Sequence, residues 1–145
     1  MQTAQAIANA GYALPEPSVE PAFREQGFGD WHGRLHTERN AERTDPLIGI
    51  WNCAPQEIPP GGESFVAVMA RVASAVDRLT EQHRGRDIVC VAHGGSIRAA
   101  LAQALGLSPA VALSFSIDNV SVTRIERLHE GFADAPQWRV RAVSA

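Results

Sequence analysis

The sequence predicts an α/β fold, a three-layer α/β/α sandwich with a mostly parallel sheet. Residues 88–92 form an apolar run without polar alternation, which is typical of a strand covered on both faces. His93, Gly94 and Gly95 follow at once, and a helical pattern of apolar residues comes next. The order of strand, glycine turn and helix is characteristic of α/β domains. A chain of 145 residues with 45% hydrophobic content can bury a substantial core, and we assign residues 1–145 to one domain.

The helices are predicted from apolar periodicity and from glycine stop signals. An Ala- and Gln-rich segment, residues 1–10, ends at Gly11. The clearest helix covers residues 65–83, where apolar side chains recur at spacings of four and three. A further helix follows the glycine turn and ends at Gly106. The apolar faces expected for these last two helices comprise Phe65, Met69, Val72, Val76 and Leu79, and Ile97, Ala100, Leu101, Ala104 and Leu105.

The remaining segments are predicted as loops, a polar helix and a hairpin. Residues 15–21 carry three prolines and should be extended, whereas the glycines and aromatics of residues 23–33 indicate a tight loop. A solvated helix is expected over residues 35–44, and a rigid turn over residues 59–62. The two strands of the C-terminal hairpin are expected to contain Val120, Val122 and Ile125, and Trp138, Val140 and Ala142, with Gly131 in their connection.

Charge and cysteine content exclude several classes of protein. Thirteen Lys and Arg stand against 16 Asp and Glu, without a block of like charge, so neither nucleic acid nor a membrane surface is expected as a partner. Cys53 and Cys90 lie far apart and imply no disulfide framework. No segment resembles a secretory signal or a membrane span. A cytoplasmic location is therefore the expectation.

The strongest candidate site lies where residues 88–92 give way to the glycine turn. It places the imidazole of His93 at the carboxyl end of a predicted strand, where open α/β sheets bind their ligands. Free N–H groups of the following helix favour an anion, and Gly94 and Gly95 allow its close approach. A phosphate fits this pattern; the alternative is a histidine that only caps the strand and bonds to nearby backbone. Arg98, one turn further, either reaches the anion or faces solvent.

Two further places could contribute acidic side chains to the site. Glu25 lies in the glycine- and aromatic-rich loop, where partial desolvation would favour the protonated form that an acid catalyst needs. The alternative is a surface glutamate in a turn. Glu63 and Ser64 either belong to the site or complement the first turn of the helix that follows. His32 and His36 are four residues apart, but no other ligand stands near them, so no metal or cofactor is predicted.

Three separated segments together resemble the histidine phosphatase (phosphoglycerate-mutase-like) superfamily. Residues 23–33 resemble the loop of its acid/base glutamate, residues 60–64 its glycine–glutamate helix entry, and residues 91–95 its second-histidine motif. Residues 119–123 are similar to a late strand of the family. The resemblance implies metal-free phosphoryl transfer through a phosphohistidine, with Glu25 as general acid/base and His93 as the second, phosphate-binding histidine. Gly94, Gly95, Glu63, Ser64 and Arg98 are the other candidate phosphate-binding residues.

The chain departs from the family where the nucleophile is expected. The first strand of the family ends in Arg-His-Gly, and no such tripeptide occurs in these 145 residues. We therefore expect a domain that is incomplete at its N-terminus, has little activity as written, and has an unpaired sheet edge that favours self-association. The expected function is that of a phosphomonoesterase for a small phosphorylated metabolite, similar to ribazole phosphatases. The alternatives are a silent phospho-ligand binding module or a phosphoglycerate mutase.

Overall fold

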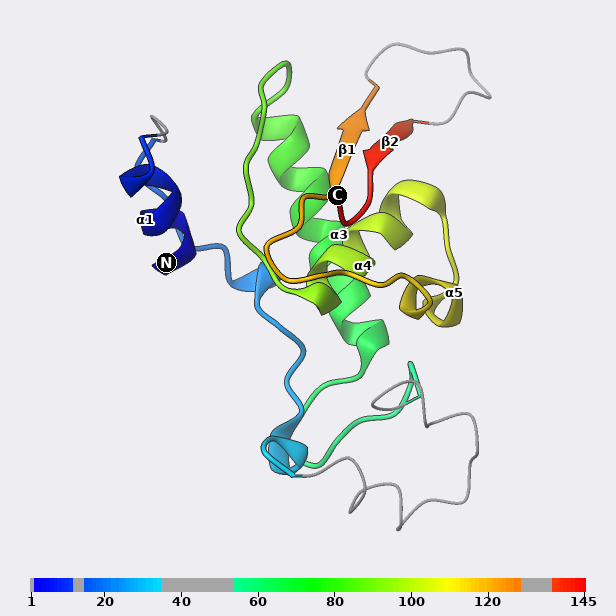
Figure 1. Cartoon of the computed structure of the whole chain (residues 1–145). Helices are drawn as coiled ribbons and strands as arrows, with labels where there is room; N and C mark the ends of the chain where they lie inside the picture. Colours follow the sequence, from blue (N-terminus) through cyan, green and yellow to red (C-terminus); the bar gives the residue numbers. More distant parts are fainter. Residues whose placement is uncertain (1, 12–14, 35–53, 129–136) are drawn as a thin grey trace.

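A computed structural model of the chain describes residues 2–11, 15–34, 54–128 and 137–145 (Figure 1). The expected helix at 35–44, His36 and the Gly131 connection lie outside these residues. None of the described helices is long and apolar enough to cross a membrane. The elements in chain order are α1 (Gln2–Asn9), η1 (Pro21–Phe23), η2 (Gly29–Trp31), α3 (Phe65–Gln82), α4 (Gly94–Leu105), α5 (Pro109–Leu113), β1 (Arg124–Arg127) and β2 (Trp138–Ala142).

Helix α3 forms the centre of the molecule; its predicted start at Phe65 is confirmed, and it ends at Gln82, one residue before the predicted end. The hydroxyl of Ser64 accepts a hydrogen bond from the N–H of Ala67 at 3.1 Å and so caps the N-terminus. The apolar face of α3 packs against α4 and α5, and η1 packs against the same helix. The buried core comprises Phe65, Val68, Val72 and Val76 of α3, Ala99 and Ala102 of α4, and Ala112 of α5.

Helix α4 is confirmed as an element, but its predicted apolar face is only partly correct. Gly106 ends the helix in the left-handed conformation at φ 62°, as its position predicted. Leu101 is fully buried, whereas Leu105 is 45% exposed. Ala99 and Ala102 enter the core instead, because their small side chains allow α4 to approach α3 closely. Periodicity identified the helix, but it could not show which stripe faces α3.

The prediction of a buried strand at residues 88–92 is wrong for the described structure. The segment leads from α3 into α4 as an irregular trace in Figure 1, and Val89 and Val91 are 68% and 45% exposed. The sheet in the described residues contains only β1 and β2, which are antiparallel, rather than the mostly parallel sheet expected. No described strand pairs with residues 88–92, so the side chains of Ile88, Val89 and Val91 stay exposed.

The C-terminal hairpin is confirmed, with a shorter first strand than expected. Ile125 pairs with Val140 in an antiparallel register, and side chains of β2 alternate between half-buried and exposed. Val120 lies outside the strand, is 97% exposed and has φ 59°, a value that a β-branched residue rarely adopts. Arg127 fastens the hairpin to α3 through an ion pair with Asp77 at 3.2 Å.

The loop of residues 27–31 is locked against the turn of residues 59–62 by direct backbone contact. The N–H of Asp30 donates to the carbonyl of Pro60 at 2.9 Å, and the N–H of Glu63 donates to the carbonyl of Gly27 at 2.8 Å. A Cβ atom on Gly29 would lie 1.9 Å from the Pro60 oxygen, and one on Gly62 would lie 2.4 Å from the Gly27 oxygen. Glycine is therefore required on both sides of this contact.

An ion pair between Glu63 and Arg71 joins this turn to helix α3. The guanidinium of Arg71 contacts both carboxylate oxygens of Glu63, with Nε to Oε2 at 3.0 Å and Nη2 to Oε1 at 2.8 Å. The N–H of Gly27 also donates to this carboxylate at 3.2 Å. The hydrogen bonds from Arg71, and then that from Gly27, lower the pKa of Glu63 against an opposing effect of burial. Glu63 is thus stabilised in its charged form.

We expect Gly29→Ala to destabilise the fold through the steric clash with Pro60. The matched control is Gly33→Ala, because both glycines have positive φ, of 49° and 80°, but nothing lies within 4 Å of a Cβ on Gly33. Gly29→Ala should lower the free energy of unfolding by about 1–3 kcal/mol more than Gly33→Ala. Urea unfolding followed by circular dichroism measures the difference. Equal losses in the two variants would contradict the proposed contact.

We expect the Glu63–Arg71 pair to make stability depend on acidic pH. The pKa of Glu63 is lower in the folded chain than its usual value, so its contribution is present at neutral pH and is lost as pH falls through the folded pKa. Urea midpoints measured between about pH 7 and about pH 3 should therefore fall more steeply for the wild type than for Glu63→Gln. Parallel curves for the two proteins would show that Glu63 is not selectively stabilised in its charged form.

Candidate functional site

The candidate site is built around the first turn of helix α4. His93 precedes the helix in an extended conformation, with φ −121° and ψ 163°, and is exposed. Gly94 and Gly95 form the first two helical positions, where backbone N–H groups have no partner inside the helix. The third position is Ser96, which is 2% exposed. The start of α4 therefore offers N–H donors and a partial positive charge next to an accessible imidazole.

Glu25 approaches this helix terminus from a segment 70 residues away in the sequence. Its carboxylate Oε2 accepts from the N–H of Gly95 at 3.5 Å, and its Oε1 accepts from the N–H of Gln26 at 2.9 Å. A Cβ atom on Gly95 would lie only 2.3 Å from Oε1 of Glu25. Glycine at this position is therefore what allows the carboxylate to reach the first turn of α4.

Arg98 lies beside the same turn. Its Nε donates to the carbonyl of Phe115 at 2.7 Å, which fixes the side chain. Its Nη1 would lie 3.2 Å from a Cβ atom on Gly94, so the guanidinium covers that glycine. Burial lowers the pKa of Arg98, and the charge of Glu25 opposes this shift, which indicates that the two side chains interact electrostatically. Since arginine stays protonated in proteins, Arg98 supplies a fixed positive charge.

Glu63 and Ser64 take part in contacts within the protein. Glu63 pairs with Arg71, and the side chain of Ser64 caps α3 and is 8% exposed. The cap matches the alternative for Ser64, which serves the first turn of α3, whereas Glu63 contacts Arg71 and the N–H of Gly27 instead of that turn. Their expected role in phosphate binding stays a prediction. The structure thus brings together Glu25, Gly94, Gly95 and Arg98, next to His93.

Sequence reasoning missed two residues that hold the site in place. The hydroxyl of Ser96 donates to the carbonyl of Phe23 at 3.0 Å and accepts from the N–H of His93 at 3.3 Å. Arg71 is the only charged residue between Glu63 and Asp77 in the sequence. A lone cation within an apolar helix, and a serine three residues after a helix cap, were the available signals.

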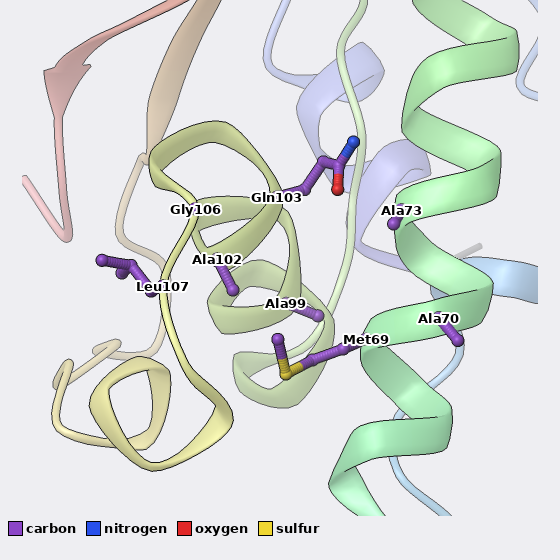
Figure 2. A pocket seen from close by; sticks show the side chains of 8 residues that line it. All are labelled: Met69, Ala70, Ala73, Ala99, Ala102, Gln103, Gly106 and Leu107. Carbon is purple, nitrogen blue, oxygen red and sulfur yellow. The ribbon is translucent and has the colours of Figure 1, made fainter.

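The hollow between α3 and α4 does not belong to the candidate site. It measures about 330 Å³, and Figure 2 shows Met69 of α3 pointing toward Ala99 of α4. It is lined by Met69, Ala70, Ala73, Ala99, Ala102, Gln103, Gly106 and Leu107. In the part of the chain that the structure describes, no group of three His, Cys, Asp or Glu side chains is placed to hold a metal ion. His32 is exposed there, and its proposed partner His36 falls outside that part.

The chain is similar in sequence to curated proteins of bacteria and plants. The chain is 28% identical over 125 residues to the adenosylcobalamin/alpha-ribazole phosphatase of Escherichia coli, a match that covers 86% of this chain and 61% of that protein. It is 35% identical over 98 residues to phosphoglycerate mutase-like protein 4 of Arabidopsis thaliana, covering 67% of this chain and 42% of that protein. The chain therefore spans less than two thirds of the length of either relative.

The chain is also similar to a solved structure. The mycobacterial glucosyl-3-phosphoglycerate phosphatase in complex with VO3 is similar with a TM-score of 0.77 and 29% identity, over 99% of this chain and 69% of that one. The same enzyme has been solved with inorganic phosphate. Its α/β fold is thus shared by this chain. A model of the histidine phosphatase superfamily (branch 1) matches residues 1–135, and the chain belongs to this superfamily.

Proposed function

We propose that this chain carries the proton-transfer and phosphate-binding part of a phosphomonoesterase for a small phosphorylated metabolite. The observation that carries the proposal is the meeting of Glu25 with the first turn of α4, where Oε2 lies 3.5 Å from the N–H of Gly95. This brings a proton-transfer group and an anion-binding helix terminus together. Phosphatases among the similar proteins, one of them solved with inorganic phosphate, support the same reading.

The proposed roles follow from the chemistry of each group. His93, the N–H groups of Gly94 and Gly95, and the fixed charge of Arg98 bind the phosphate oxygens and stabilise the charge that develops during transfer. Glu25 donates a proton to the leaving oxygen as the ester bond to phosphorus breaks. It then accepts a proton from the water that releases phosphate from a phosphohistidine. Glu63 is joined to the loop by the N–H of Gly27, and Ser64 caps α3.

The nucleophilic histidine is the part of this reaction that these residues do not supply. No Arg-His-Gly tripeptide occurs in the 145 residues. We propose that the complete domain is a three-layer α/β/α sandwich in which a strand bearing this tripeptide pairs with residues 88–92. Their exposed, apolar and unpaired state in the described structure supports this arrangement. The same feature favours self-association of the chain alone.

Phosphate binding tests the proposed anion site directly. Titration of the chain with inorganic phosphate, followed by amide NMR spectra, should shift the signals of Gly94 and Gly95. His93→Ala should weaken binding about tenfold or more, since a hydrogen bond to a charged group contributes about 1.5–3 kcal/mol. Glu25→Gln should still bind. The control His83→Ala changes a histidine at the far end of α3 and should bind as the wild type does. Unchanged binding in His93→Ala would overturn the assignment.

Measuring phosphate ester hydrolysis distinguishes a phosphatase from a silent binding module. The absence of the Arg-His-Gly tripeptide by itself favours the silent module. We expect the chain alone to hydrolyse p-nitrophenyl phosphate very slowly, since loss of a nucleophile costs roughly a million-fold in a serine hydrolase. A chimera with a histidine phosphatase strand ending in Arg-His-Gly joined ahead of Met1 should be active. Glu25→Gln in this chimera should lower kcat by about 10²–10⁴-fold. A folded chimera that binds phosphate without hydrolysis would favour the silent module.

A further inference from the structure

Arg71 makes more contacts with the loop of Glu25 than its pairing with Glu63 requires. Its side chain is 16% exposed, and two of its nitrogens contact the Glu63 carboxylate. The same guanidinium also donates to three backbone carbonyls of the loop. The acceptors are the oxygens of Ala22 at 2.5 Å, Arg24 at 3.0 Å and Glu25 at 3.2 Å. One side chain of α3 therefore bonds to the turn before the helix and to the loop beside it.

These contacts need the geometry of arginine. A guanidinium carries five N–H donors in a rigid plane, so it can pair with a carboxylate in two places and still reach other acceptors. The pairing with Glu63 orients the plane, and the remaining N–H groups then point at the loop carbonyls. A lysine could keep the charge but has a single flexible ammonium group.

The side chain of Glu25 has little free space where it meets helix α4. Its carboxylate lies against Gly95, where an added Cβ atom would be 2.3 Å from Oε1. A displacement of about 1 Å in the position of a reacting group can cost about a hundredfold in rate. The only regular structure next to Glu25 on its N-terminal side is the three-residue helix η1. The position of Glu25 therefore depends on contacts with α3 and α4. Arg71 bonds to the backbone of Glu25 itself.

We infer that Arg71 is a positioning residue for proton transfer: it fixes the backbone of residues 22–25 so that the carboxylate of Glu25 is held at the first turn of α4. The inference rests on the proposed function, in which Glu25 is the acid/base group. The hydrogen bonds of Arg71 end on the carbonyls of the loop and on Glu63, and none of those the structure gives reaches the first turn of α4. Its effect on the reaction is transmitted through the backbone carbonyls of the loop.

The test measures, at constant neutral pH, how far Glu25→Gln shifts the amide NMR signal of Gly95 in the whole chain, and compares this shift between the wild type and variants of Arg71. In the wild type Glu25→Gln should shift the Gly95 signal, because it removes the carboxylate that accepts from the Gly95 N–H. In Arg71→Met the shift should be lost, while the signals of the core residues Val76 and Leu101 stay in place. Arg71→Lys should give an intermediate shift.

The matched control is Arg78→Met, two turns along α3. Arg78 pairs with Glu20 of the same loop but donates to none of the three carbonyls, so its variant should keep the full Gly95 shift. A full shift in Arg71→Met overturns the inference. If Arg71→Met does not fold, a full shift in Arg71→Lys overturns it equally. If the wild-type Gly95 signal does not respond to Glu25→Gln, the contact behind the proposed function is absent, and that proposal fails first.

Discussion

The candidate site depends on one constraint, the attachment of an irregular loop to helix α3. Residues 21–31 contain only two short 3₁₀ segments, which cannot hold a catalytic side chain in place by themselves. The loop is fixed from outside by the Glu63–Arg71 pair and by hydrogen bonds to the turn before α3. The pair is half-buried, and the guanidinium of Arg71 donates both to the Glu63 carboxylate and to three carbonyls of residues 22–25. Glu25 is placed by this attachment.

A second feature of the site is that glycines permit close backbone approach at two different contacts. Gly29 and Gly62 let the loop lie directly on the turn of residues 59–62, and Gly95 lets the carboxylate of Glu25 reach helix α4. In each case an added Cβ atom would meet backbone or carboxylate atoms. Gly95 thus reduces the distance between Glu25 and the N–H groups of α4, whereas Gly29 and Gly62 reduce the distance between the loop and the turn before α3.

Charged groups of both signs lie close together at the start of α4. The positive end of the helix dipole, the guanidinium of Arg98 and the carboxylate of Glu25 lie around the same two glycines. The carbonyl of Phe115 accepts a hydrogen bond from Arg98 and so helps to hold its guanidinium beside the helix start. Such a fixed arrangement of donors and one acidic group suits a reaction in which phosphate binds and a proton moves.

The sequence by itself determined the family, the helices α3 and α4 and the hairpin, because these depend on periodicity, glycine stops and motifs that are local in the chain. It also singled out Glu25 and His93. Only the tertiary structure decided that Glu63 pairs with Arg71, that Ser96 reaches Phe23, and that Ala99 and Ala102 face α3 while Leu105 stays exposed. The tertiary structure also showed that residues 88–92 have no partner strand among the described residues. Side-chain pairing and strand coverage are set by segments distant in sequence, and no local pattern records them.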